Sequence, residues 1–256
     1  MLRVISLFKG MKIVISESQY KRLMESESDQ KVLRIPSLKF FNDDWFLLQE
    51  FLEKKGNPPY SLGGDLDLGG KPVKSLGNLQ SVGGDLYLGG SRIKSLGNLQ
   101  SVDGYLYLEE TPIKSLGKLQ SVGGYLNLRG TPIKSLGNLI SVGGDLVMDD
   151  TPIKSLGNLQ FVGNRLYMPG TKIDSLGNLK SVGGDLSLQG SEIQSLGNLT
   201  TVGGELNLIS TKINSLGKLN FVGKNLYLQR TPLSNEYTEE QIRKMVDVEG
   251  EIYLSV

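Results

Sequence analysis

The chain has 256 residues, with 28 Lys and Arg against 27 Asp and Glu, and it contains no Cys and no His. The even charge provides no basic arm for nucleic acid or an anionic membrane, and the missing residues exclude disulfides, thiolate chemistry and the commonest general base. No apolar run approaches the roughly 20 residues of a transmembrane helix, and the opening residues lack the features of a signal peptide. The expected location is therefore cytoplasmic or virion-associated.

Residues 1–56 do not repeat and are expected to form an N-terminal cap or docking segment with two short helices. A strand-like run begins at Met11, which also leaves open that the first ten residues are an upstream start or a linker. A capping-box pattern, Ser16 followed three residues later by Gln19, predicts the first helix over about 17–27.

The second helix is predicted over 45–55, after the polar capping residues 42–44 and before Gly56. Its apolar side chains recur at helical spacing: Trp45, Leu48, Phe51 and Leu52. An apolar helix face directly before a repeat array is typical of a lid over the first coil, because a terminal coil otherwise exposes its core.

From Ser61 to about Glu240 a twenty-residue unit recurs, and its most regular element is an apolar pair separated by one residue. A local period of two indicates a strand with both apolar side chains inward, and the flanking Gly83-Gly84 and Gly89-Gly90 predict corners with positive φ. Stacked at about 4.8 Å per rung, the units would give a parallel sheet roughly 45–50 Å long. The pairs lie at 66/68, 86/88, 106/108, 126/128, 146/148, 166/168, 186/188, 206/208 and 226/228.

After the last unit the next apolar pair, Ile252 and Leu254, comes six residues late. The extra length contains a capping box that begins at Thr238, with Ile242, Met245 and Val246 on one helical face. We therefore expect a C-terminal cap over 235–256, made of a short helix and a closing strand at 251–255.

The repeat resembles a leucine-rich repeat, since GDLYLGGSRI at 84–93 and GYLNLRGTPI at 124–133 match the spacing of its LxLxxNxL core. GGDLYL is also similar to receptor L-domain repeats. The resemblance implies a right-handed solenoid. Together with the residue patterns above, we expect a mainly β, parallel β-solenoid over 57–234, which with the closing strand has about ten rungs, between helical N- and C-terminal caps. Ser or Thr replaces the family's Asn, and the short unit favours a nearly straight stack. The family's habit of binding ligands on the exposed sheet is implied as well.

One column of hydroxyl residues, from Ser91 to Thr231, is almost uniform from copy to copy. Such uniformity favours a repeated hydrogen bond to the backbone at a corner. The alternative is a flat array of Thr that binds ice or another ordered lattice, although Pro112, Pro132 and Lys172 would make that face uneven.

A second column places five like charges on successive rungs: Lys74, Lys94, Lys114, Lys134 and Lys154. Two ammonium groups about 5 Å apart repel by roughly 0.8 kcal/mol in water, and salt reduces this. The column is either a solvated stripe that resists edge aggregation or an anion-binding edge for a polyanion or an acidic partner.

The outward strand positions vary most between copies and form the candidate binding face. The period places Tyr87 beside Tyr107 and Tyr105 beside Tyr125, and it stacks residues of alternating charge. These side chains either stabilise the sheet through cross-strand pairs, worth about 0.2–1 kcal/mol each, or form an interface. The candidate residues are Tyr87, Tyr105, Tyr107, Glu109, Tyr125, Arg129, Asp149 and Tyr167.

Catalytic interpretations find little support in the sequence. The carboxylate pairs Glu109-Glu110 and Asp149-Asp150 would stand two rungs, about 10 Å, apart with Arg129 between them, and the repeat predicts no cleft. The glycines occupy repeat corners rather than a phosphate-binding loop. We therefore expect no enzyme, no cofactor and no metal site.

The sequence predicts a non-catalytic repeat scaffold that binds a protein or glycan partner through the Tyr-rich outer face. The alternative is a structural component, for example of a virion or a surface structure, that docks through its N-terminal segment. Near-identical copies suggest recent duplication and a bacterial or phage origin, while the ligand and the oligomeric state stay open.

Overall fold

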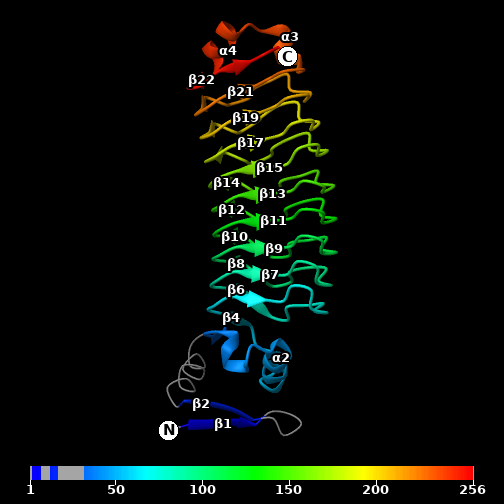
Figure 1. Ribbon diagram of the computed structural model, residues 1–256, viewed down its shortest axis with the longest axis vertical. Coiled ribbons are helices and arrows are strands. Elements are labelled where there is room, and N and C mark those ends of the chain that lie inside the picture. Colours follow the sequence, from blue (N-terminus) through cyan, green and yellow to red (C-terminus); the bar gives the residue numbers. More distant parts are fainter. Residues whose placement is uncertain (1, 7–11, 17–31, 256) are drawn as a thin grey trace.

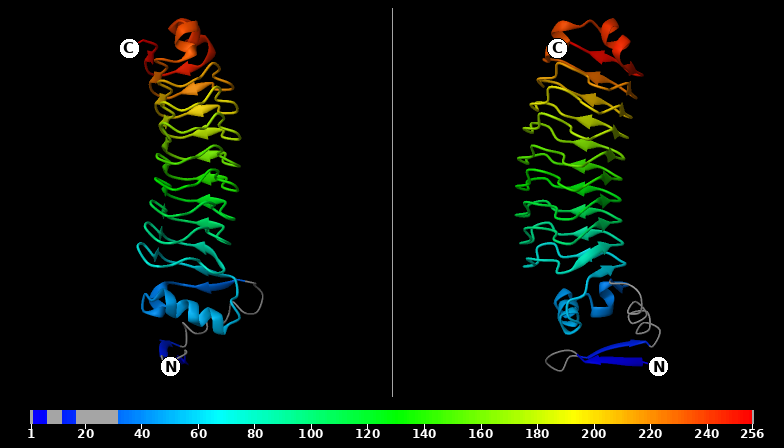
Figure 2. Two further views of the ribbon diagram at one scale, coloured as in Figure 1. Left: turned by 90° about the vertical axis from the view of Figure 1, so that its right-hand side faces the viewer. Right: turned by 180° about the vertical axis from the view of Figure 1, so that it is seen from behind.

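The computed structural model describes residues 2–6, 12–16 and 32–255 (Figure 1). The helix predicted over 17–27 lies outside these residues. The chain folds as a mainly β, parallel solenoid of about eight turns. Its strands stack into a long column (Figures 1 and 2). At one end lie β1 (Leu2–Ser6), β2 (Lys12–Ser16) and α2 (Trp45–Lys54), and at the other lie α3 (Pro232–Glu236) and α4 (Glu239–Met245).

The apolar pairs form a parallel sheet of ten strands in which each turn lies directly over the one before it. Leu86 pairs with Leu106 and Leu106 with Leu126, and this twenty-residue register continues from Leu66 to Leu226. The last step, from Leu226 to Ile252, is longer. The strands are β5 (Leu66–Asp67), β7 (Leu86–Tyr87), β9 (Leu106–Tyr107), β11 (Leu126–Asn127), β13 (Leu146–Val147), β15 (Leu166–Tyr167), β17 (Leu186–Ser187), β19 (Leu206–Asn207), β21 (Leu226–Tyr227) and β23 (Ile252–Tyr253).

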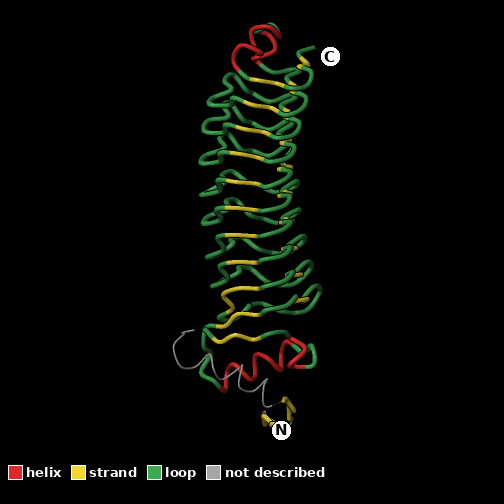
Figure 3. Tube along the Cα trace, turned by 90° about the vertical axis from the view of Figure 1, so that its left-hand side faces the viewer, coloured by secondary structure: helices red, strands yellow, loops and turns green. Residues whose placement is uncertain are grey.

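A second parallel sheet, which the sequence analysis missed, runs up another side of the column (Figure 3). Its regular strands are only two residues long, too short for an alternating pattern to be recognised. The strands are β3 (Leu33–Ile35), β4 (Tyr60–Leu62), β6 (Leu79–Val82), β8 (Ser101–Val102), β10 (Ser121–Val122), β12 (Ser141–Val142), β14 (Phe161–Val162), β16 (Ser181–Val182), β18 (Thr201–Val202), β20 (Phe221–Val222) and β22 (Asp247–Val248).

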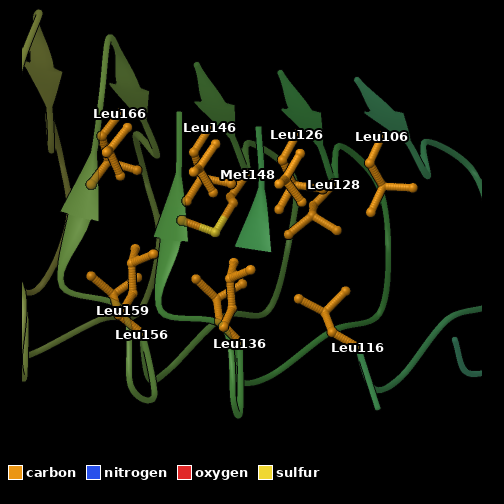
Figure 4. Packing of buried hydrophobic residues seen from close by; sticks show 14 of the residues in the cluster. Leu106, Leu116, Leu126, Leu128, Leu136, Leu146, Met148, Leu156, Leu159 and Leu166 are labelled. Atoms are coloured by element: carbon orange, nitrogen blue, oxygen red, sulfur yellow. The ribbon is translucent and has the colours of Figure 1, made fainter. Parts of the chain in front are cut away.

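The core is a set of apolar columns that run the length of the solenoid. In the turn from Leu126 to Val142, the inward Leu, Ile and Val side chains are each at most 1% exposed. Figure 4 shows Leu106, Leu126, Leu146 and Leu166 in one row of equivalent side chains. One turn cannot bury such side chains by itself, so burial depends on the neighbouring turns above and below.

The prediction for the corner glycines was partly wrong. Gly90 has a φ of +65°, as expected, but Gly83, Gly84 and Gly89 do not have positive φ. Gly83 instead allows close stacking, because a Cβ at this position would lie 2.8 Å from the carbonyl oxygen of Gly63. The corner that the analysis missed is Gly97, with a φ of +60°.

The N-terminal elements begin with an antiparallel pair, β1 (Leu2–Ser6) and β2 (Lys12–Ser16), which confirms the strand predicted near Met11. A 3-10 helix, η3 (Leu38–Phe41), precedes α2 (Trp45–Lys54). The second predicted helix is thus confirmed to within one residue. Its N-cap carboxylate accepts hydrogen bonds from two backbone N–H groups, and its apolar face joins the solenoid core.

At the C-terminal end two helices occur where one was predicted: α3 (Pro232–Glu236) and α4 (Glu239–Met245). The capping box of Thr238 and Gln241 is confirmed, and Ile242 is fully buried. Met245, predicted on the same buried face, is 48% exposed. Among the described residues, no helix has the length and apolarity needed to span a bilayer.

Candidate binding face

Four tyrosines of the ten-stranded sheet form a contiguous group on its outer surface, here called the tyrosine cluster: Tyr87, Tyr105, Tyr107 and Tyr125. The rings of Tyr87 and Tyr107 are stacked, with centroids 4.9 Å apart and planes within 8°. Tyr105 meets Tyr107 and Tyr125 edge to face, at 6.3 and 6.4 Å. The cluster therefore confirms both neighbour pairs expected from the repeat.

The register of the sheet produces this arrangement. Tyr87 and Tyr107 are direct partners on β7 and β9, so their outward side chains lie one above the other. Tyr105 precedes β9 on the same outward side, and the ring of Tyr125, one turn on, lies 5.4 Å from that of Tyr107. Aromatic pairs of this geometry add about 0.5–1.5 kcal/mol beyond their buried area.

Desolvation and nearby carboxylates disfavour ionisation of three hydroxyl groups of the cluster. The hydroxyl of Tyr87 donates a hydrogen bond to Asp85 at 3.0 Å, and this bond, followed by desolvation, raises the pKa of Tyr87 to about 12. Desolvation and then the nearby charges, Asp85 for Tyr107, also raise the pKa of Tyr107 and Tyr125. Tyr87, Tyr107 and Tyr125 consequently stay neutral to a higher pH than a free phenol does.

The column of alternating charge is only partly paired. Arg129 lies 3.0 Å from Asp149 and 3.6 Å from Asp150, with 64% of its side chain exposed. Oε2 of Glu109, one turn below Arg129, is buried without a hydrogen-bond partner in the described part of the chain. The Glu109 side chain instead lies against Gly89, where an added Cβ would be 3.0 Å from its Oε1.

The remaining predicted residue, Tyr167, is 39% exposed and belongs to the same outer surface on β15. Its direct strand partners are Val147 and Ser187, so the register does not stack it on another tyrosine. A second stacked pair, Tyr227 and Tyr253, has centroids 4.8 Å apart and was missed. Twenty-six residues separate these two tyrosines, so the regular period of twenty residues does not place them together.

The aspartates before the outer strands have a structural role that the sequence analysis missed. Asp85 Oδ1 accepts a hydrogen bond from the backbone N–H of Tyr105, one turn on, at 2.7 Å. Asp65, Asp145 and Asp185 accept equivalent bonds from the turns that follow them. These carboxylates therefore tie neighbouring turns together at the edge of the candidate face.

The hydroxyl column points into the solenoid and all eight of its side chains are buried. In six of the turns Thr Oγ1 donates to the carbonyl oxygen three residues earlier, at 2.6–3.0 Å, which confirms the predicted backbone bond. A flat, exposed Thr array for ice or a lattice is therefore wrong.

The lysine column, Lys74, Lys94, Lys114, Lys134 and Lys154, is exposed along its whole length. Backbone hydrogen bonds from Lys114 to Lys94 and from Lys154 to Lys134, at 3.2 and 3.0 Å, show that its members occupy adjacent turns. No carboxylate of the described residues lies within ion-pair distance of these five ammonium groups.

Within residues 2–6, 12–16 and 32–255, no three Asp or Glu side chains converge on a point where a metal ion could be held. Comparison with protein-family models finds no match to this chain, and comparison with the curated proteins finds none either. The candidate face is thus defined by its own geometry: aromatic rings on a parallel sheet, bordered by carboxylates.

Proposed function

We propose that the chain is a non-catalytic repeat scaffold that binds a protein or glycan partner through the outer face of its ten-stranded sheet. The observation that carries this proposal is the tyrosine cluster, four rings in mutual contact at the surface. In the same proposal the coil is right-handed and leucine-rich-repeat-like, with about ten rungs, and the helical segments at its two ends act as caps.

The chemistry of tyrosine supports a binding role. Each ring offers apolar area together with a hydroxyl group, and few rotatable bonds must be fixed on binding, so tyrosine is enriched at interfaces. Interior positions repeat almost unchanged from turn to turn, whereas outward positions vary, as in the column that runs from Tyr107 to Asn127 and Val147. Repeat proteins acquire specific binding surfaces when their outward residues vary while their interior residues stay constant.

The test replaces two stacked rings, Tyr87→Ala together with Tyr107→Ala. Ligands are first selected with the wild-type chain from a glycan array and a displayed peptide library. Their affinities for the double variant are then measured by calorimetry. We expect a loss of at least about tenfold in affinity, as for a central aromatic pair. The melting temperature should fall by only a few degrees, because the stacked pair adds about 0.5–1.5 kcal/mol and the core is unchanged.

The matched control is Tyr227→Ala with Tyr253→Ala, which removes an equally stacked pair outside the cluster. This control should retain the affinity of the wild-type chain. Ligands that bind all three proteins equally would show that the tyrosine cluster is not the binding site and would refute the proposal.

A second candidate function is assembly through the N-terminal segment. The observation that favours it is the separate two-stranded sheet of β1 and β2, which is not hydrogen-bonded to either sheet of the solenoid. A deletion that tests docking should stop at residue 31, because β3 belongs to the eleven-stranded sheet and Ile35 and Leu38 are buried. Incorporation of the shortened chain into its assembly as efficiently as the full chain would refute this candidate.

A further inference from the structure

The first five turns separate their charges into two groups of segments. The basic segments are the parts of each turn that run from the buried hydroxyl position to the second sheet: residues 71–82, 91–102, 111–122, 131–142 and 151–162. They contain eight basic residues and no acidic one: Lys71, Lys74, Arg92, Lys94, Lys114, Lys118, Lys134 and Lys154.

The acidic segments are the parts of the same turns that carry the tyrosine cluster: residues 63–70, 83–90, 103–110, 123–130 and 143–150. They contain one basic residue, Arg129, and nine acidic ones: Asp65, Asp67, Asp85, Asp103, Glu109, Glu110, Asp145, Asp149 and Asp150. The two groups of segments therefore carry net charges of +8 and −8.

This separation ends with the fifth turn. Residues 163–170 carry Arg165 where acidic residues predominated before, and residues 171–182 include Asp174 in line with the lysine column. The charges of the first five turns are thus a local feature rather than a property of the repeat itself.

Part of each group of charges is available to a partner. Three carboxylates are instead engaged in hydrogen bonds between turns: Asp65, Asp85 and Asp145. The lysine column is exposed and has no carboxylate partner among the described residues, so its repulsion is not relieved inside the molecule. On the other side Asp103, Glu110 and Asp150 are exposed. Within the part of the chain that the structure describes, Asp150 is the one of these three with an ion pair, a long one at 3.6 Å to Arg129.

We propose that this chain associates side by side with a second copy of itself, the lysine column of one copy lying against the acidic, tyrosine-bearing face of the other. The basic and acidic segments that contain these surfaces carry net charges of +8 and −8 over the same five turns, and both repeat with the same rung spacing. Each ammonium group of one copy can therefore meet a carboxylate or the face of a tyrosine ring in the other. This inference names the partner of the proposed binding face and rests on that proposed function.

The contact joins two different surfaces, so each copy keeps one surface unoccupied. Further copies can bind these surfaces, and the chains can form a row. Five turns at about 4.8 Å give a contact roughly 24 Å long. A contact held together mainly by exposed charges is weak and depends on ionic strength.

The experiment is sedimentation velocity of the full chain over a concentration series. At about 0.02 M salt the wild-type chain should sediment faster as concentration rises, and at about 0.5 M salt it should sediment as a monomer. Two charge-reversal variants test the pairing. The first carries Lys94→Glu, Lys114→Glu and Lys134→Glu, and the second carries Asp103→Lys, Glu110→Lys and Asp150→Lys. Circular dichroism verifies that each is folded.

Each reversal variant alone should associate far more weakly at low salt, because reversing three charges reduces the net charge of the basic segments from +8 to +2 or that of the acidic segments from −8 to −2. An equimolar mixture should associate again, since the unchanged acidic face of the first variant meets the unchanged lysine column of the second. The matched control carries Lys172→Glu, Lys180→Glu and Lys212→Glu, the same change of charge outside the five turns, and should associate like the wild-type chain.

A wild-type chain that stays monomeric at low salt overturns the inference, as does association that survives both reversals or fails to return on mixing. Retention of a monomeric wild-type chain on immobilised polylysine would assign the acidic face to a foreign basic partner and also overturn it. Neither result refutes the proposed function, which fails only if the double tyrosine variant keeps the affinity of the wild-type chain for selected ligands.

Discussion

Eight Ser and Thr hydroxyl groups are buried in the described core, and two of them lack a hydrogen-bond partner there. Oγ of Ser91 and of Ser191 is unpaired among the described residues, whereas Thr at six equivalent positions donates to a carbonyl oxygen. A buried hydroxyl without a partner costs about 1–3 kcal/mol. The β-branched Thr has fewer χ1 rotamers, which favours the one that reaches the carbonyl.

We predict that Ser91→Thr raises the free energy of unfolding by about 0.5–1.5 kcal/mol. The added methyl group increases the buried apolar area, and the hydroxyl takes up the bond seen in Thr111. Urea titration followed by circular dichroism measures the change, with Thr131→Ser as the reverse substitution. A lower urea midpoint for Ser91→Thr would show that the position has no room for the methyl group.

Backbone strain is a second feature of single residues. The corner occupied by Gly in most turns is Glu110, Asp150, Ser210 or Arg230 in the others, each with a φ of 56–59°. A left-handed conformation costs a residue with a Cβ about 1–2 kcal/mol, partly offset by the greater freedom of Gly in the unfolded chain.

Ser210→Gly should therefore stabilise the chain by about 0.5–1 kcal/mol, measured as a shift of the thermal midpoint. Gly130→Ala is the matched control, because Gly130 has a φ of +67° and no neighbouring atom within 4 Å of an added Cβ. Since only the backbone conformation opposes that Ala, the control should be destabilised by a similar amount. Equal midpoints for all three proteins would refute the account.

At the scale of single elements, α4 contacts the last turn through one side of a short helix. Ile242 is fully buried beneath it, while Met245, three residues later, is 48% exposed. Ile242→Ala should destabilise the chain by about 2–4 kcal/mol, the range for removing a buried aliphatic group. Met245→Ala should change stability by less than about 0.5 kcal/mol. Guanidinium titration separates the two, and equal effects would contradict the burial of Ile242.

Elements with a strong local signal were predictable from the sequence. The helix over Trp45–Lys54 has both a cap and a helical apolar pattern, and the LxL strands repeat at a fixed spacing. Strands such as Ser101–Val102 were missed because two residues carry no periodicity, and their pairing is created by stacking between turns. Met245 was misplaced because helical spacing alone does not show where a short helix meets its neighbours.

At the scale of the whole molecule, the candidate face was predictable as far as the period is constant. The contact between Tyr87 and Tyr107 follows from residues twenty positions apart that lie in register. The stacked Tyr227 and Tyr253 could not be found in this way, since twenty-six residues separate them. The hydrogen bond from the backbone N–H of Tyr105 to Asp85 depends on the side-chain rotamer of Asp85, which the sequence pattern does not specify.

The constant register between Leu66 and Leu226 has a consequence for how such a molecule changes during evolution. Because each turn contacts only the turns above and below, one unit can be gained or lost in a single recombination event without disturbing the rest. Each gain lengthens the rod by one pitch of about 4.8 Å. The number of units thus sets the distance between the two ends of the solenoid, and that distance changes only by whole repeats.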